Sequence, residues 1–378
     1  MLHATAVLDG TRRLPRDSRV DVLRGIALFM IFIDHVPGNL LSLVTLRNFG
    51  FADAAELFVL LAGFASMVAY GGSFARDGTL TGLRRVLLRL LHLYLFQALL
   101  LATVLILASV WIHNVGIAPE SDAAFVHSGL NGLRHGLTLQ ALPASLNILP
   151  LYIVLLALFP LIYGLIALQP MIALLASGGL WVWVNLEPSF NLPNWLDGSG
   201  WFFNPFAWQF LFVIGALGAL LLRRYGGDLP VPRWLLAFAW GYLGFALIVM
   251  APWDSWGWSE LRLIPMQVPD KTALAPLRLL NVMAIAVLVF GSPRLRVLAD
   301  TPAFRFLLVC GRHSLEVFAL GTILAMIWRL TFSTFGVTLT TQLLANGIGL
   351  GLMIALGMLL EHGRGPSTRK SVAPAPTV

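Results

Sequence analysis

Two ionisable residues in the first apolar segment have a spacing that favours joint chemistry. Arg24 and His35 are eleven residues apart. At about 100° per residue, this spacing brings an α-helix about 20° past three full turns, so both side chains share one face. A rise of about 1.5 Å per residue separates them by roughly 16 Å, about half of a bilayer core. Asp21 lies three residues before Arg24, and we expect these two residues to form a structural ion pair.

Carboxylates accompany His35 in the sequence. Asp34 directly precedes it, and Glu56 opens the next apolar segment. An imidazole whose second ring nitrogen donates to a carboxylate is a common general base for a hydroxyl. We therefore predict that His35, Glu56 and Asp34 form a catalytic group near one membrane surface. The alternatives are that the histidine only packs and that Glu56 faces lipid headgroups.

Arg278 and Asp53 are candidates for binding an acyl group or an acceptor. Arg278 begins a late apolar segment, where a guanidinium could bind a carboxylate or stabilise an oxyanion. An ion pair of Arg278 with Asp270 or Glu260 is an equally good interpretation. Asp53 lies three residues before Glu56, on the same helix face.

Arg312 and His313 are candidates for binding the phosphates of a nucleotide-containing donor. Arginine suits this task because its planar fork of donors matches phosphate geometry. Glu316 lies four residues after Arg312, so a pair within one helix explains that arginine equally well. His313 is the weaker candidate, because it could simply cap a helix or pack.

Tryptophans gather in the loops between apolar segments and could stack on sugars. Trp256 and Trp258, interleaved with Asp254 and Glu260, are the best candidates for an acceptor site. Tryptophan also forms the interfacial belts of membrane proteins, which is an equally good explanation. The sequence shows no spacing of metal ligands and no glycine-rich phosphate loop, so we expect no bound metal.

The composition requires a lipid environment for these residues. Of the 378 residues 58% are hydrophobic and 11% are charged, and mean hydropathy is +0.82. A soluble domain carries roughly 25% charged residues and could not cover this much apolar surface. The chain is therefore expected to be an all-α integral membrane protein rather than a soluble enzyme or a disulfide-rich scaffold.

Ten transmembrane helices are expected from the apolar stretches, since each needs roughly 20 residues. They are about 22–45, 54–72, 87–111, 147–168, 170–187, 203–222, 234–251, 275–292, 306–328 and 339–361.

The basic residues predict the orientation of these helices. With the N-terminus inside, 19 of the 25 Lys and Arg residues fall on the cytoplasmic side and 6 on the other. This asymmetry favours an N-in, C-in topology. The net charge of +7 is thus a signal of orientation, and no nucleic-acid partner is expected.

Six segments carry a family resemblance. The Arg24–His35 pair matches the hallmark of the acyltransferase-three superfamily, an Arg, ten residues and then a His. The segments together resemble the OpgC family and cover about residues 17–330. They are DVLRGIALFMIFIDHVPGN (21–39), NFGFADAAELFVLLAGF (48–64), NILPLYIVLLALFPL (147–161), GWFFNPFAWQFLFVIGA (200–216), DKTALAPLRLLN (270–281) and CGRHSLEVFALG (310–321).

The resemblance implies a membrane succinyltransferase that acts on osmoregulated periplasmic glucans. A cytoplasmic acyl-CoA, most simply succinyl-CoA, would be a co-substrate rather than a resident cofactor. His35 would be the general base, Glu56 or Asp34 would orient it, and Arg24 would face the donor. The protein would be a multi-pass component of the bacterial inner membrane, with lipid and glucan as its partners.

The implied domain organisation is simple. Residues 1–19 would be a cytoplasmic segment, 20–362 a polytopic acyltransferase domain and 363–378 a disordered cytoplasmic tail. Intramembrane charges also occur in proton-coupled secondary transporters, which remain the alternative. Transporters usually contain repeated halves, and the sequence shows no such repeat.

Overall fold

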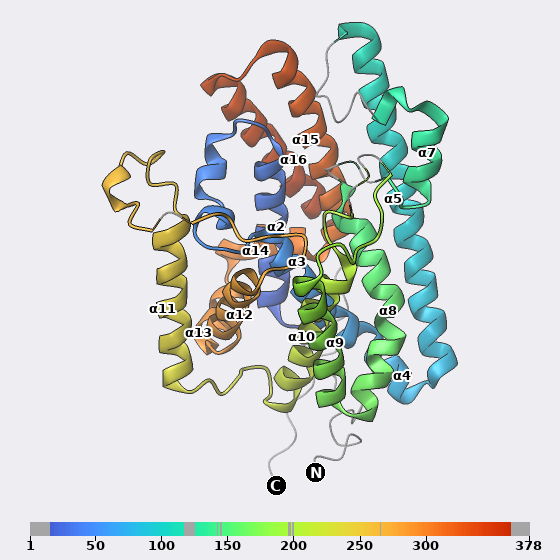
Figure 1. Ribbon diagram of the computed structural model, residues 1–378, viewed down its shortest axis with the longest axis vertical. Coiled ribbons are helices and arrows are strands. Elements are labelled where there is room, and N and C mark those ends of the chain that lie inside the picture. The colour runs from blue at the N-terminus through green and yellow to red at the C-terminus, as the bar shows by residue number, and fades with distance from the viewer. Residues whose placement is uncertain are drawn as a thin grey trace.

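A computed structural model describes residues 16–116, 125–141, 143, 146–195, 198, 200–264 and 266–363. Within these residues the protein is built from helices, and Figure 1 shows most of them running along the long axis of the molecule. Residues 1–15 of the expected segment 1–19 and residues 364–378 of the expected tail 363–378 lie outside the described residues.

The described helices follow the expected apolar stretches closely. They are α2 (Ser18–His35), α3 (Ala54–Ser66), α4 (Gly72–Arg76), α5 (Thr79–Val115), α7 (Gly129–Leu137), α8 (Ile148–Leu168), α9 (Pro170–Leu186), α10 (Pro205–Arg224), α11 (Arg233–Met250), α12 (Pro276–Phe290), α13 (Pro293–Ala299), α14 (Arg305–Arg312), α15 (Ser314–Phe335) and α16 (Leu339–Gly363).

Seven helical segments in the described part are long and apolar enough to cross a membrane, or eight if the bent α12–α13 pair is one span. The expected number of ten is therefore not reached. A helix occupies each expected position, but three of the ten are not among the seven. The first, α2, carries Arg19, Asp21, Arg24 and Asp34, α9 has 17 residues, and α12 meets α13 at 81°. The sequence from Gly291 to Pro293 explains this bend, because proline interrupts the hydrogen-bond ladder of a helix.

Three expected spans have clearly different bounds. The third, 87–111, is part of the longer helix α5, which runs from Thr79 to Val115. The first, 22–45, ends as a helix at His35, where Val36 is extended and Pro37 follows. Gly38 then has a φ of +64°, which favours glycine, and two short 3-10 turns follow. The ninth, 306–328, is broken at His313, which separates α14 from α15. We call the two ends of the helix bundle the His35 end and the Arg19 end, after residues at either end of α2.

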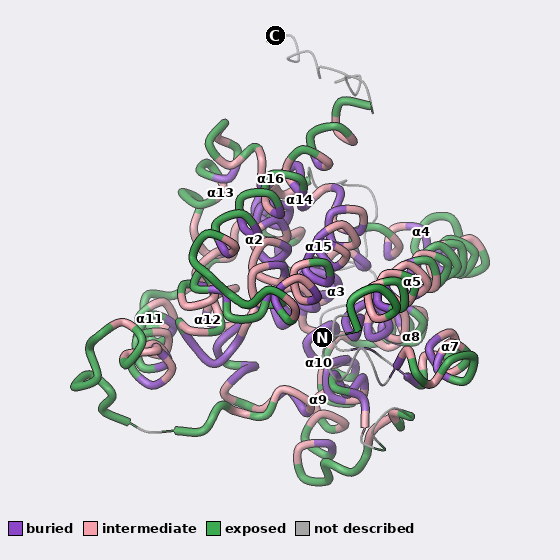
Figure 2. Tube along the Cα trace, turned by 90° about the horizontal axis from the view of Figure 1, so that it is seen from above, coloured by how far each residue is buried: buried purple, intermediate pink, exposed green. Residues whose placement is uncertain are grey.

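The central helices pack by direct contact between backbones. A Cβ on Gly63 of α3 would lie 1.9 Å from the Phe212 carbonyl oxygen of α10, and one on Gly215 of α10 would lie 2.0 Å from that of Leu60. These reciprocal glycines hold α3 and α10 together, as small residues do in membrane bundles. In Figure 2 the buried residues concentrate on α3, α10 and α15, and exposed residues on α5 and α11. Apolar side chains exposed on α5, such as Leu87 and Leu95, suit contact with lipid.

Candidate functional site

His35 ends α2 with its ring held by the backbone. Nδ1 lies 2.7 Å from the carbonyl oxygen of Ile31, one turn earlier. Because a carbonyl only accepts, Nδ1 donates, and the neutral ring then keeps Nε2 free of a proton. Among the described residues no carboxylate bonds to this ring. The expectation that Glu56 or Asp34 orients His35 was therefore wrong, and a backbone carbonyl does so instead.

His35 lines a cavity of about 310 Å³, at the lower end of the range for small-ligand sites. Charged and apolar side chains from seven parts of the chain meet there. The lining residues include Asp34, Arg47, Asp53, Asn147, Ile148, Phe202, Lys271 and Phe318. We call this space the His35 cavity.

Asp53 and Glu56 begin α3 and hold its N-terminus in a capping box. Asp53 accepts from the Ala55 amide at 2.8 Å, and Glu56 accepts from the Asp53 amide at 2.9 Å. The carboxylates also face the positive end of the helix dipole. Because side chains satisfy these amides, the buried start of α3 is fixed beside the His35 cavity.

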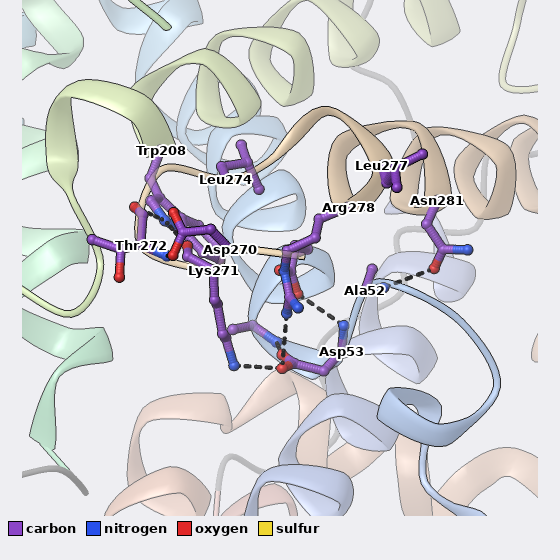
Figure 3. Close-up of polar contacts among 12 residues, drawn as sticks. Ala52, Asp53, Trp208, Asp270, Lys271, Thr272, Leu274, Leu277, Arg278 and Asn281 are labelled. Carbon is purple, nitrogen blue, oxygen red and sulfur yellow. Dashed lines mark hydrogen bonds and ion pairs between the residues drawn. The ribbon is translucent and has the colours of Figure 1, made fainter. Parts of the chain in front are cut away.

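Two cations, Arg278 and Lys271, pair with these carboxylates to form a charged cluster (Figure 3). Arg278 of α12 donates from Nε to Glu56 at 2.6 Å and from Nη2 to Asp53 at 3.2 Å. Lys271, from the loop before α12, also pairs with Asp53. Burial acts to raise the pKa of Asp53, but the charges of Lys271 and Arg278 outweigh it and lower that pKa to about 2. Asp53 is therefore ionised at neutral pH.

Arg278 is a buried member of this cluster. Its side chain is 4% exposed, and its partners are Asp53 and Glu56 rather than the expected Asp270 or Glu260. It is not among the residues that line the His35 cavity. The predicted binding role of Arg278 is untested, and the visible contacts are those of a residue that positions the carboxylates of α3.

Asp34 lies in the last turn of α2, and its carboxylate contacts the loop beyond that helix rather than His35. Its Oδ1 accepts from the Thr45 hydroxyl at 2.8 Å and lies 3.9 Å from Nε of Arg47. Asp34 therefore connects the end of α2 with the short turn that carries Arg47.

A second cavity of about 240 Å³ lies next to the His35 cavity and shares Ile148 and Phe318 with it. Arg24 lines this space with Ser66, Tyr152 and several other residues. Within the described part of the chain, the Ser66 hydroxyl is buried without a hydrogen-bond partner, so it is available to a polar ligand group. We call this space the Arg24 cavity.

Arg24 points toward α3, where its Nη2 donates to the Leu61 carbonyl at 2.9 Å. The expected Asp21–Arg24 pair was wrong, because Asp21 pairs with Arg16 at 2.6 Å and with Arg312 at 3.7 Å. Asp21 is thus a structural residue, but with different partners.

A third cavity of about 320 Å³ lies at the Arg19 end and shares Ala69 with the Arg24 cavity. Arg76, Arg85 and Arg223 line it. The helix between these two cavities contains a π-helical turn, Met67–Gly71, a distortion that often occurs at functional sites. The three adjoining cavities thus extend from basic residues at the Arg19 end to His35 at the opposite end.

Arg312 and His313 bind a carboxylate of the protein itself. Arg312 donates to Glu361 of α16 at 2.6 Å, and His313 Nε2 lies 3.1 Å from the same carboxylate. The alternative Arg312–Glu316 pair is not formed, because the helix breaks at His313. Neither residue lines any of the three cavities. Their predicted role toward a donor stays untested.

Trp256 and Trp258 belong to the loop after α11. Trp256 packs on Phe49 with ring centroids 5.8 Å apart, and Trp258 lies beside Trp253 at 6.5 Å. Neither lines the His35 cavity, whereas Phe202 does and is 48% exposed. An aromatic acceptor platform at the cavity would therefore use Phe202.

Three residues that line the His35 cavity were not predicted as site residues: Arg47, Phe202 and Lys271. Lys271 had a usable signal, because it is one of two lysines in a chain rich in arginine. Phe202 and Arg47 carried no such signal, since a loop aromatic and a loop arginine are common in membrane proteins.

The helices and the cavities define a class of protein. It is an all-helical, multi-pass membrane protein with a histidine and a charged cluster in a cavity at one end. Among the described residues no group of His, Cys, Asp and Glu could hold a metal ion.

A family model described as OpgC protein matches residues 16–364. The chain therefore belongs to the OpgC family, which implies an acyltransferase and confirms the resemblance seen in the sequence. No curated protein and no solved structure matches the chain.

Proposed function

We propose that this protein is a membrane-bound O-acyltransferase that moves a succinyl or similar acyl group from cytoplasmic acyl-CoA to hydroxyls of a periplasmic glucan. The observation that carries the proposal is the series of adjoining cavities between His35 and the basic residues at the Arg19 end. Membership of the OpgC family supports the reaction class. In this proposal the Arg19 end faces the cytoplasm and the His35 end the periplasm of a bacterial inner membrane.

The donor would bind along all three cavities. Its phosphates would bind near Arg76, Arg85 and Arg223, because guanidinium matches phosphate geometry. The pantetheine arm, which carries amides, would pass Arg24 and the unpartnered Ser66 hydroxyl. The thioester would then lie in the His35 cavity. This assignment replaces Arg312 and His313, whose charge partner is already Glu361.

The chemical step would use His35 as a general base. Nε2 accepts the proton of the sugar hydroxyl while the hydroxyl oxygen attacks the thioester carbonyl carbon. The carbon–sulfur bond then breaks, and the thiolate of CoA takes the proton back from His35. The products are the sugar ester and free CoA, so His35 returns to its neutral form.

Lys271 would stabilise the oxyanion of the tetrahedral intermediate. Its ammonium lines the same cavity as His35 and is held by Asp53 and above the ring of Phe203, at 5.4 Å from its centroid. A cation that is fixed before the reaction stabilises developing negative charge more effectively than mobile water.

The test is transfer of labelled succinate from succinyl-CoA to a glucan by the purified full-length protein. His35→Ala should lower the rate by about 10²- to 10⁴-fold. His92→Ala is the matched control, because His92 is exposed on α5 and lines none of the three cavities. Transfer that survives His35→Ala unchanged contradicts the catalytic assignment. Uptake of labelled substrate into vesicles without an acylated product would identify the transporter alternative instead.

A further inference from the structure

Arg47 lies at the rim of the His35 cavity on a well-fixed turn. It belongs to the 3-10 turn Leu46–Asn48, between α2 and α3. The Thr45 hydroxyl bonds to Asp34 and to the Ser42 carbonyl, each at 2.8 Å, and the Asn48 amide also donates to Ser42. The backbone on both sides of Arg47 is therefore held in place, which presents its side chain at a defined position.

The guanidinium of Arg47 is weakly engaged compared with the other cations nearby. Its one ion pair within the described residues, with Asp34, spans 3.9 Å, which is too long for a hydrogen bond. Lys271 and Arg278 are instead bound closely by the carboxylates of α3. Half of the Arg47 side chain is exposed. Arg47 thus offers donors to a ligand in the His35 cavity, whereas Arg278 is buried against two carboxylates and Lys271 is less exposed and pairs with Asp53.

We infer that Arg47 binds a terminal carboxylate on the acyl chain and makes the site selective for dicarboxylic acyl donors. This inference rests on the proposed function, because the proposed function places the thioester beside His35. A guanidinium can bind a carboxylate with two parallel hydrogen bonds. Ile31, Ile148 and Phe318 supply apolar walls for the methylenes between the thioester and that carboxylate.

The same features argue against a role for Arg47 in binding a neutral sugar. A sugar hydroxyl offers the guanidinium one uncharged acceptor atom, whereas a carboxylate offers two charged acceptor atoms that match the fork of the guanidinium. Arg278 was the residue predicted for an acyl carboxylate, but it is buried and held by two carboxylates already. Arg47 is the cation at this cavity that combines exposure with unoccupied donors.

The experiment compares succinyl-CoA with acetyl-CoA as donors for the full-length protein. Arg47→Gln should lower kcat/KM for succinyl-CoA by about 10- to 100-fold, the loss expected for a charge-assisted hydrogen bond. It should leave kcat/KM for acetyl-CoA within about threefold of wild type, because the acetyl group has no carboxylate. Arg47→Lys should give an intermediate selectivity, because it keeps the charge and loses the fork. Arg262→Gln is the control, since Arg262 is a similarly exposed loop arginine that pairs with Asp254 and does not line the cavity.

The outcomes separate this inference from the proposed function. A parallel fall for both donors in Arg47→Gln assigns Arg47 to the fold or to the shared chemistry and overturns the inference. Unchanged selectivity in both Arg47 variants, or a wild-type preference for acetyl-CoA, also overturns it. A wild-type protein that transfers neither group overturns the proposed function itself.

Discussion

Nε of Arg278 and Oε1 of Glu56 lie 2.6 Å apart in a pair whose side chains are 4% and 0% exposed. They come from helices separated by 222 positions in the sequence. The pair fastens α12 to the first turn of α3, directly beside the His35 cavity. Because both side chains are buried away from solvent, each charge is stabilised mainly by the opposite charge of its partner.

Breaking this pair should be costly to the fold. Glu56→Leu leaves the buried Arg278 with Asp53 alone, and removing one partner of a buried pair costs about 3–5 kcal/mol. Thermal unfolding in detergent measures the effect. Glu187→Leu is the control, because Glu187 is exposed at the end of α9, and it should change stability by less than about 0.5 kcal/mol. A Glu56→Leu variant as stable as the control would show that the pair contributes little.

Lys271→Met should lower kcat while the KM values for donor and acceptor change little. Loss of an oxyanion donor typically costs about 10²- to 10³-fold in kcat. Lys271→Arg keeps the positive charge and should recover part of this loss. Steady-state kinetics with both substrates varied separates the parameters. A rise in KM with unchanged kcat would assign Lys271 to ground-state binding instead.

Arg85→Gln should weaken donor binding and leave the chemical step intact. Arg85 lines the cavity at the Arg19 end and lies 3.2 Å from Asp77. Because its side chain is half exposed, we expect KM for the acyl-CoA to rise by only about threefold to tenfold. Arg233→Gln is the matched control, since Arg233 is exposed at the start of α11 and does not line the cavity. A fall in kcat alone would place the donor phosphates elsewhere.

The low pKa of Asp53 predicts how stability depends on pH. The folded-state pKa of about 2 lies below the ordinary value of 3.8, so the folded protein favours the ionised form. The resulting stabilisation, on the order of 2 kcal/mol, is fully present above about pH 4 and is lost as the pH falls toward 2. Asp53→Asn keeps a side-chain oxygen for the helix cap but removes the charge. Unfolding measured between pH 2 and 6 should therefore vary less in this variant, and identical pH profiles would contradict the prediction.

The membrane class and the positions of the helices could be predicted because they depend on local composition. The positions at which the helices break were harder to predict from the sequence. Whether His313 interrupts a helix depends on how α14 and α15 pack against their neighbours, and the sequence around it contains no proline. The proline two residues after Gly291 indicated that the helix would bend there, but the sequence did not indicate the angle of 81°.

Ion-pair partners were the least predictable feature of the site. Local spacing suggested Asp21 with Arg24, and Arg312 with Glu316, because residues three or four apart meet on one helix. The partners of Asp21 and Arg312 instead include residues of other helices, which become neighbours only when the bundle assembles. Lys271 reaches Asp53 across 218 positions for the same reason.

The reciprocal contact of Gly63 and Gly215 has a mechanical consequence. It locks α3 against α10 at backbone distance, and the segment from Asp53 to Ala69 forms one side of both the His35 cavity and the Arg24 cavity. A carrier alternates its opening by rocking one half of the bundle against the other. A helix pair that resists sliding suits a fixed active site, which donor and acceptor would reach from opposite compartments. In the proposed function only the acyl group would change sides, and the barrier would stay sealed throughout.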